Sequence, residues 1–190
     1  MTTFAPTRRA VLAAGLAVPF VASPVRAVQT EDGRFHEPWF VETFLDLAED
    51  VAEATAAGRR YAVVWEQRGC PFCRDMHTVH FADPAITDYV RSNFDVLQLD
   101  LHGAREVTDF DGTKLTEKAF AARYGIRLTP TVQFFPESAE GLAGKAPTAR
   151  EVARMPGLLP PRDFLAIFHY VREKAYERMS FPDFARTQAG

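Results

Sequence analysis

Cys70 and Cys73 are the only two cysteines in this 190-residue chain, and they stand two residues apart. Two thiols at that spacing can close and open one disulfide during a catalytic cycle. An apolar, strand-like run over 61–65 precedes the pair, and a helix-compatible run over 73–81 follows it. A cysteine pair at a strand-to-helix junction is typical of redox sites. With no second pair, the fold cannot rest on a structural disulfide.

Residues 1–27 have the pattern of a secretory signal. Arg8 and Arg9 precede an uncharged stretch over 10–25, which is shorter than the roughly 20 residues that span a bilayer. Small or β-branched residues near its end offer a cleavage point. The arginine pair indicates twin-arginine export in a bacterium, with general export as the alternative. Either route predicts a mature domain of residues 28–190 in the periplasm.

The charge pattern excludes one class of partner. The formal net charge is −3, and acidic and basic residues are interspersed without a basic block. Since nucleic-acid-binding domains cluster their Lys and Arg, nucleic acid is excluded as a partner. The mature length suits one domain with a real core and is too short for two ordinary ones. No segment before Gly58 offers a separate dimerisation domain, so we expect a monomer.

Hydrophobic periodicity predicts alternating helices and strands in the mature chain. A strand, a helix and a strand in succession predict a parallel crossover, and the last two strands predict an antiparallel hairpin. The predicted helices cover 39–57, 71–81, a short stretch from Pro84, 119–124 and 161–178; the predicted strands cover 61–66, 94–101, 131–135 and 151–155; a small surface hairpin pairs 106–108 with 113–115.

The two sulfurs are expected to play different roles. Only a thiolate attacks a disulfide, and a helix N-terminus stabilises a thiolate through its unpaired backbone N–H groups. Cys70 stands at that position and is predicted to be the nucleophile that forms a mixed disulfide with a substrate. Cys73, one turn into the helix and more buried, is predicted to resolve it. Arg68 and Arg74 flank the pair, either stabilising the thiolate or standing as solvated surface charges.

Three separated motifs together resemble the thioredoxin superfamily. They are Cys70-Pro71-Phe72-Cys73 after a strand, Thr129-Pro130-Thr131 at the start of a later strand, and Gly157 after the last strand. The resemblance covers roughly residues 38–178. It implies an α/β thioredoxin fold, with three layers in α/β/α order and a central mixed sheet of about four strands flanked by helices. Stretches at 66–73, 105–110 and 125–131 are similar to the SoxW-type periplasmic thioredoxins associated with bacterial sulfur oxidation.

The resemblance also implies roles for individual residues. Pro130 is expected to be a cis proline packed against the active-site disulfide, and Thr129 to offer its backbone to an extended substrate peptide. Pro71 and Phe72, between the cysteines, are expected to contact substrate. The implied activity is that of a reductase without a cofactor other than its own disulfide. It would be recharged by a membrane thiol-electron transporter and would act on a cysteine-containing periplasmic client protein.

One position departs from ordinary thioredoxins. They carry a buried Asp six residues before the first cysteine, where this chain has Val64. Residues two apart on a strand share a face, so Glu66 projects on the same side as Val64 and nearer the thiols. Glu66 is therefore the candidate proton acceptor for the resolving thiol. The competing interpretation is a carboxylate solvated at the strand end.

Two alternatives use the same cysteine pair. A periplasmic disulfide oxidant shares the fold and the motif and differs in reduction potential. A Cu(I)-binding metallochaperone would use the two thiolates as soft ligands. Cys70, Cys73, His77 and His80 share one helical face, but four ligands along a single helix cannot surround a zinc ion tetrahedrally. No metal site is therefore predicted, and His77 and His80 are expected to be packing or surface residues.

Overall fold

A four-stranded mixed sheet organises the chain. The computed structural model describes residues 1, 27–30 and 33–188, so the predicted signal lies almost wholly outside the described residues. The strands run in the order β4-β3-β7-β8. Parallel pairing of β3 with β4 confirms the predicted crossover, and antiparallel pairing of β7 with β8 confirms the predicted hairpin. The strand bounds are Arg60–Glu66 for β3, Phe94–Asp100 for β4, Thr131–Phe134 for β7 and Ala153–Pro156 for β8.

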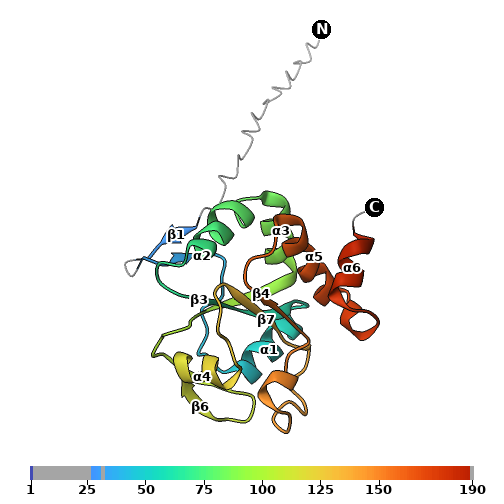
Figure 1. Cartoon of the computed structure of the whole chain (residues 1–190). Coiled ribbons are helices and arrows are strands. Elements are labelled where there is room, and N and C mark those ends of the chain that lie inside the picture. The colour runs from blue at the N-terminus through green and yellow to red at the C-terminus, as the bar shows by residue number, and fades with distance from the viewer. Residues whose placement is uncertain (2–26, 31–32, 189–190) are drawn as a thin grey trace.

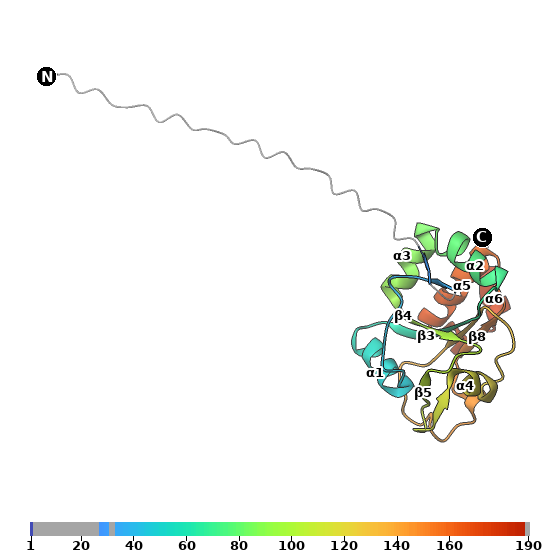
Figure 2. The same cartoon turned by 90° about the vertical axis from the view of Figure 1, so that its left-hand side faces the viewer.

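Helices cover both faces of this sheet, as Figures 1 and 2 show. Every residue of β3 is buried, with Ala62 and Val64 in one core cluster and Tyr61, Val63 and Trp65 in the other. This alternation is the period of two that a strand imposes on its side chains. The helices on the Val64 side are α2 (Pro71–Asp75), α3 (Pro84–Asn93) and α5 (Pro161–Arg172), and those on the other side are α1 (Leu47–Ala56) and α4 (Glu117–Arg123). The expected three-layer α/β/α arrangement is confirmed.

The first helix is shorter than its periodicity predicted. We expected a helix over 39–57, but α1 begins at Leu47, with Asp46 as its N-cap accepting from the N–H groups of the first turn. Leu45 has a φ of 62°, a left-handed value that interrupts a helix. Phe40 packs into the opposite core cluster from Leu47. Tertiary packing of Phe40 and the Asp46 cap therefore override an apolar spacing that resembles a helix.

The C-terminal region also differs from expectation. The predicted helix over 161–178 ends at Arg172, because Lys174 adopts a left-handed φ of 52° and a 3-10 turn, η3 (Ala175–Glu177), follows. A further helix, α6 (Phe181–Thr187), then packs against α5 (Figure 1). Phe184 is buried there and contacts the ring of Tyr170, with 5.5 Å between ring centroids. The tail is therefore part of the core on the α5 side.

Several short elements complete the described structure. The predicted surface hairpin is present as β5 (Glu106–Thr108) and β6 (Lys114–Thr116), and the loop before β8 contains a 3-10 turn, η2 (Pro147–Ala149). Two further elements were not predicted: the N-terminal hairpin of β1 (Val28–Gln29) and β2 (Phe35–His36), and a π-helical turn, η1 (Met76–His80), that continues α2. Within the described ranges, no helix is long and apolar enough to cross a bilayer.

Asp50 on α1 predicts a pH-dependent contribution to stability. It is buried, and its Oδ2 accepts hydrogen bonds from the hydroxyls of Tyr61 at 2.7 Å and Thr43 at 3.0 Å. Burial raises the pKa of Asp50 to about 6, although these two hydrogen bonds oppose the shift. The folded state therefore holds this proton more tightly than the unfolded state. The contribution is fully present below about pH 4 and is lost as pH rises through about 6.

We expect the free energy of unfolding of Asp50→Asn, relative to the wild type, to rise by about 2 kcal/mol between pH 4 and pH 7. Chemical denaturation across that range measures the difference. Glu49→Gln, at the exposed neighbouring position, is the matched control and should give a curve parallel to the wild type. A parallel curve for Asp50→Asn as well would contradict the prediction.

Candidate active site

Cys70 lies where β3 gives way to α2. It is the N-cap of α2, and its Sγ accepts a hydrogen bond from the backbone N–H of Cys73 at 3.1 Å. Pro71 follows in the first turn, where its missing N–H leaves no intrahelical bond unmade. Cys70 is partly exposed. The donated N–H and the helix N-terminus both favour negative charge on an accessible sulfur.

Cys73 has the opposite environment. Its side chain is buried, and both cysteines are free thiols in this structure. Burial raises the pKa of the Cys73 thiol far above its usual value, and the contact with Cys70 and the charge of Glu66 add to the increase. Cys73 therefore holds its proton until a base removes it. The two sulfurs differ as the sequence predicted, with Cys70 facing outward and Cys73 inward.

The loop before β7 lies against Cys70. The Thr129–Pro130 peptide bond is cis, as the resemblance implied, and Pro130 is buried. The thiol of Cys70 donates to the Thr129 carbonyl oxygen at 3.4 Å, and the Thr129 hydroxyl donates to Cys70 Sγ at the same distance. These contacts bring residues 59 positions apart in the chain to one sulfur. The two predicted motifs therefore meet at one site.

Exposed apolar side chains stand beside the reactive sulfur. Phe72, between the two cysteines, is 59% exposed, and Leu128, next to Thr129, is 58% exposed. Pro71 is also exposed. An extended segment of another protein could cover these side chains while its own disulfide approached Cys70. The predicted substrate-contacting residues are thus placed at the surface of the site.

Glu66 is buried beneath the cysteine pair, so the solvated-carboxylate interpretation is wrong. It is 1% exposed, although it is the last residue of β3. Its Oε1 accepts from Gln98 Nε2 at 2.9 Å and lies 2.9 Å from His77 Nε2. Glu66 follows Ala62 and Val64 on the same strand face, as predicted from the spacing. The carboxylate therefore faces the layer that contains α2.

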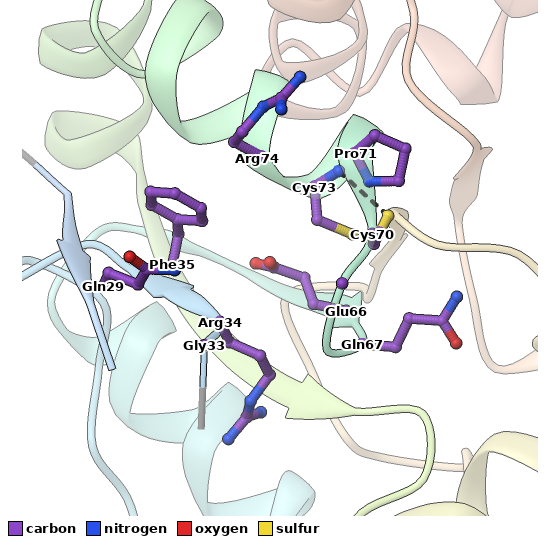
Figure 3. Close-up of a pocket in the computed structure, with 11 residues that line it drawn as sticks. Gln29, Gly33, Arg34, Phe35, Glu66, Gln67, Cys70, Pro71, Cys73 and Arg74 are labelled. Atoms are coloured by element: carbon purple, nitrogen blue, oxygen red, sulfur yellow. Dashed lines mark hydrogen bonds between the residues drawn. The ribbon is translucent and has the colours of Figure 1, made fainter. Parts of the chain in front are cut away.

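A cavity of about 230 Å³ opens beside the two sulfurs (Figure 3). Its lining includes Glu66, Cys70 and Cys73 from the core of the site and Gln29 and Phe35 from the N-terminal hairpin. Figure 3 shows that hairpin as one wall of the cavity, opposite the start of α2. The site therefore includes a segment from the beginning of the described chain.

Arg74 and His80 have partners of their own. Arg74 donates to Asp75 Oδ1 at 2.9 and 3.0 Å, and Arg68 is exposed. These positions favour the interpretation of both arginines as surface charges. His80 Nε2 lies 2.8 Å from the Leu159 carbonyl oxygen. In the part of the chain that the structure describes, no three His, Cys, Asp or Glu side chains are arranged to hold a metal ion.

Sequence reasoning missed three residues of the site. His77 was expected to be a packing or surface residue, but it is buried and bonds two carboxylates, Glu37 and Glu66. Gln98 links Glu66 to the N-terminal hairpin, since its amide also donates to the Phe35 carbonyl oxygen at 2.7 Å. A polar residue inside the apolar run of β4 was a signal for Gln98. Nothing local in the sequence pointed to Glu37.

Comparison with known proteins identifies the family and the fold. A model of the thioredoxin-like domain matches residues 47–172. Among solved structures, a thioredoxin-fold protein from Helicobacter pylori is 16% identical, with a TM-score of 0.52 and coverage of 77% of this chain and 96% of that chain. A thioredoxin from Thermus thermophilus is 27% identical, with a TM-score of 0.48 and coverage of 66% and 83%. No curated protein sequence matches the chain. Since the matched residues make up more than half of the chain and contain both cysteines, the chain belongs to the thioredoxin-like domain family.

Proposed function

We propose that this chain is a thiol:disulfide oxidoreductase that reduces disulfides in a client protein. The observation that carries the proposal is the pairing of an accessible Cys70 at a helix N-terminus with a buried Cys73 one turn below it. A nucleophile must reach the substrate, and a resolving thiol must stay silent until the mixed disulfide forms. The environments of the two sulfurs match these two requirements.

The proposed cycle begins with the Cys70 thiolate. It attacks one sulfur of the client disulfide, the client S–S bond breaks, and the released client thiolate takes a proton from solvent. Glu66 then accepts the proton of Cys73, and the Cys73 thiolate attacks Cys70 Sγ. The mixed disulfide breaks, the second client sulfur leaves as a thiolate that takes a proton from solvent, Glu66 returns its proton to solvent, and a Cys70–Cys73 disulfide remains. Two electrons have passed to the client, so a dithiol donor must return two to the protein.

Thr129 and Pro130 are proposed to position the client. A peptide lying along the loop before β7 would meet the Thr129 backbone beside Cys70, with Phe72 as a neighbouring apolar contact. The cis bond and the contacts between Thr129 and Cys70 support this placement. No bound cofactor is needed, because the electrons move only between sulfur atoms.

The cellular setting is a proposal from the sequence. The signal pattern of residues 1–27 supports export to the periplasm, and the resemblance to SoxW-type thioredoxins supports a client in sulfur oxidation. In that setting a membrane thiol-electron transporter would return the electrons. We propose that the mature domain acts there as a monomer.

The reduction potential of the Cys70–Cys73 pair tests the direction of the reaction. The purified domain of residues 28–190 is equilibrated with glutathione buffers, and its free thiols are trapped and counted. A reductase is expected near the thioredoxin value of about −270 mV. A value near about −120 mV would overturn the reductase assignment and support a disulfide oxidant. Cys73→Ser is the control, since it cannot form the intramolecular disulfide.

A further inference from the structure

Three ionisable side chains form a buried chain of contacts beneath the cysteine pair. His77 Nδ1 lies 2.9 Å from Glu37 Oε1, and His77 Nε2 lies 2.9 Å from Glu66 Oε1. All three side chains are 1% exposed or less. They come from three separate places: the segment after β2, the end of β3 and the π-helical turn η1. We call this set the Glu-His-Glu cluster.

We propose that the Glu-His-Glu cluster acts as one unit that receives the proton of Cys73, with His77 and Glu37 as positioning residues for Glu66. The inference rests on the proposed function, because it concerns the step in which Cys73 resolves the mixed disulfide. Glu66 lines the same cavity as Cys73 and its charge acts on that thiol, whereas His77 and Glu37 act through Glu66.

The hydrogen-bond pattern fixes which atom takes the proton. Glu66 Oε1 is occupied by Gln98 Nε2 and His77 Nε2. The second oxygen, Oε2, is therefore the one available to a proton from Cys73. Since Gln98 Nε2 also holds the Phe35 carbonyl oxygen, the carboxylate cannot rotate freely without breaking contacts to the hairpin. The cluster therefore holds Glu66 in one orientation in the cavity that Cys73 also lines.

His77 is positively charged in this arrangement. Burial opposes the charge, but the hydrogen bonds to Glu37 and Glu66 raise the pKa of His77 to about 9. Both ring nitrogens then donate, one to each carboxylate. A neutral ring could donate to only one of the two. With both carboxylates ionised, the cluster carries one net negative charge in a buried position.

The negative charge of Glu37 favours uptake of a proton by the cluster. A buried net charge is costly, and one proton from Cys73 would make the cluster neutral. Without Glu37, the imidazolium would pair with Glu66 alone, and that neutral pair would resist further protonation. Glu37 Oε2 is buried without a hydrogen-bond partner among the described residues, so this carboxylate depends on His77 for its stabilisation. When Glu66 is protonated, the positively charged ring of His77 still forms an ion pair with Glu37.

Aromatic rings surround the imidazole, and charged side chains, Arg34 and Arg74, line the cavity that Glu66 also lines. Phe35, Phe40 and Phe81 pack around the imidazole, with ring centroids 5.8 to 5.9 Å away. From the neighbouring elements, Cys73 on α2 faces Glu66, and His36 on β2 bonds Gln98 Oε1 at 2.9 Å. At the end of β4, Asp100 forms an ion pair with Arg34 at 3.7 Å. Cys73 is thus the group positioned to exchange a proton with Glu66.

Glu37 lies outside residues 47–172, which the thioredoxin-like domain model matches. The N-terminal segment therefore adds a residue to the site that the matched domain does not contain. That segment also supplies Phe35, which both stacks on His77 and accepts from Gln98. The position of Glu37 explains why a local motif search could not find the cluster.

A single-turnover assay separates this inference from the proposed function. Cys70 is first loaded with 5-thio-2-nitrobenzoate as a mixed disulfide. Cys73 then gives up its proton, attacks Cys70 Sγ and releases the coloured thiolate, whose absorbance reports the rate. The rate is measured across the pH range in the wild type, Glu37→Gln, His77→Gln and Glu66→Gln. The assay requires no client and no electron donor. Its result therefore does not depend on whether the protein reduces or oxidises its client.

The variants are expected to shift the acid limb of the rate profile in opposite directions. Glu37→Gln removes a negative charge, so ionised Glu66 persists to lower pH, and as a weaker base it slows release several-fold at neutral pH. His77→Gln removes a positive charge beside two carboxylates, so the acid limb moves to higher pH. In Glu66→Gln the acid limb of the pH–rate profile should be absent, and the thiolate should be released at least about 100-fold more slowly. His80→Gln, a buried histidine of the same turn that bonds a backbone carbonyl, is the control and should match the wild type.

The outcomes are distinguishable. No release by the wild type would overturn the proposed function. Normal release by the wild type, with acid limbs unmoved in Glu37→Gln and His77→Gln, would overturn the cluster alone. Equal slowing of both variants at every pH would indicate a structural role and would also overturn it. If His77→Gln does not fold, the position of the acid limb in Glu37→Gln tests the proposal without it.

Discussion

Replacing Cys70 with Ser is expected to abolish disulfide reduction, whereas replacing Cys73 with Ser is expected to stop the cycle one step later with the client attached. Cys70 is the accessible sulfur, and a serine hydroxyl in its place cannot attack a disulfide at neutral pH. Turnover should fall at least about a thousandfold. With Cys73→Ser, Cys70 still attacks, but no second thiol resolves the mixed disulfide.

Non-reducing electrophoresis and mass spectrometry of protein incubated with a disulfide-bonded peptide measure both effects. Cys73→Ser should accumulate a covalent adduct that dithiothreitol releases, and Cys70→Ser should form none. Thr78→Ser, an exposed position on the same helical segment, is the matched control and should turn over like the wild type. An adduct on Cys73 in the Cys70→Ser protein would contradict the assigned roles.

The parts of the fold that the sequence predicts are those set by local periodicity and local caps. The β-branched and aromatic run of β3 is buried on both faces, as expected for a central strand. Asp83 caps α3 through Ala85, with Pro84 in the first turn. Each of these features depends on residues within one or two turns of each other. The resemblance then supplied the order of the layers, which periodicity alone does not give.

The elements that the sequence missed depend on long-range contacts. The apolar spacing over 39–46 resembles a helix, but Phe40 is needed in the core on the Val64 side of the sheet. The π-helical turn at Met76–His80 shows no distinct periodicity, and it is closed by the Phe81 N–H donating to the Met76 carbonyl oxygen at 2.8 Å. The packing of α6 against the domain depends on the contact between Phe184 and Tyr170 on α5. None of these contacts has a local signature.

The residues of the site also separate into those that local sequence predicts and those that only long-range contacts bring together. Cys70, Cys73 and Glu66 were found because they lie within eight consecutive residues, where strand and helix geometry relate their positions. His77 was visible as the residue four after Cys73, but its role depends on Glu37, which lies 40 positions earlier in the chain. The fold alone brings these two side chains together. A carboxylate pair that encloses one histidine is therefore a property of the structure rather than of a motif.

A second large effect is expected far from the sulfurs, in a buried ion-pair network beside α4. Arg150 is 2% exposed, and its guanidinium lies 2.8 Å from Asp109 Oδ1 and 2.9 Å from Asp111 Oδ2. The Tyr124 hydroxyl also donates to Asp109 Oδ1 at 2.7 Å. Arg150 further donates to the carbonyl oxygens of Lys145 and Ala143, at 3.1 and 3.2 Å. One side chain thus joins the β5–β6 hairpin, the end of α4 and the long loop before β8.

Arg150→Met is expected to lower the free energy of unfolding by about 3 kcal/mol, because it leaves the buried Asp109 with only the partly exposed Arg123, at 3.2 Å, as a charge partner. Chemical denaturation measures the loss, and the midpoint of thermal unfolding should fall by about 10 °C. Arg59→Met is the matched control. Arg59 pairs with Asp95 at 2.7 Å but is 37% exposed, so its loss should cost only about 0–1 kcal/mol.

The double variant Arg150→Met with Asp109→Leu separates the cost of an unpaired charge from the loss of packing. Replacing both members of a buried pair with apolar residues should recover part of the stability lost in the single variant. A single variant no less stable than Arg59→Met would contradict the role given to the network. Because the network does not contact Cys70, Cys73 or Glu66, the folded Arg150→Met protein should keep the wild-type reduction potential. Stability and sulfur chemistry are therefore expected to vary independently in this fold.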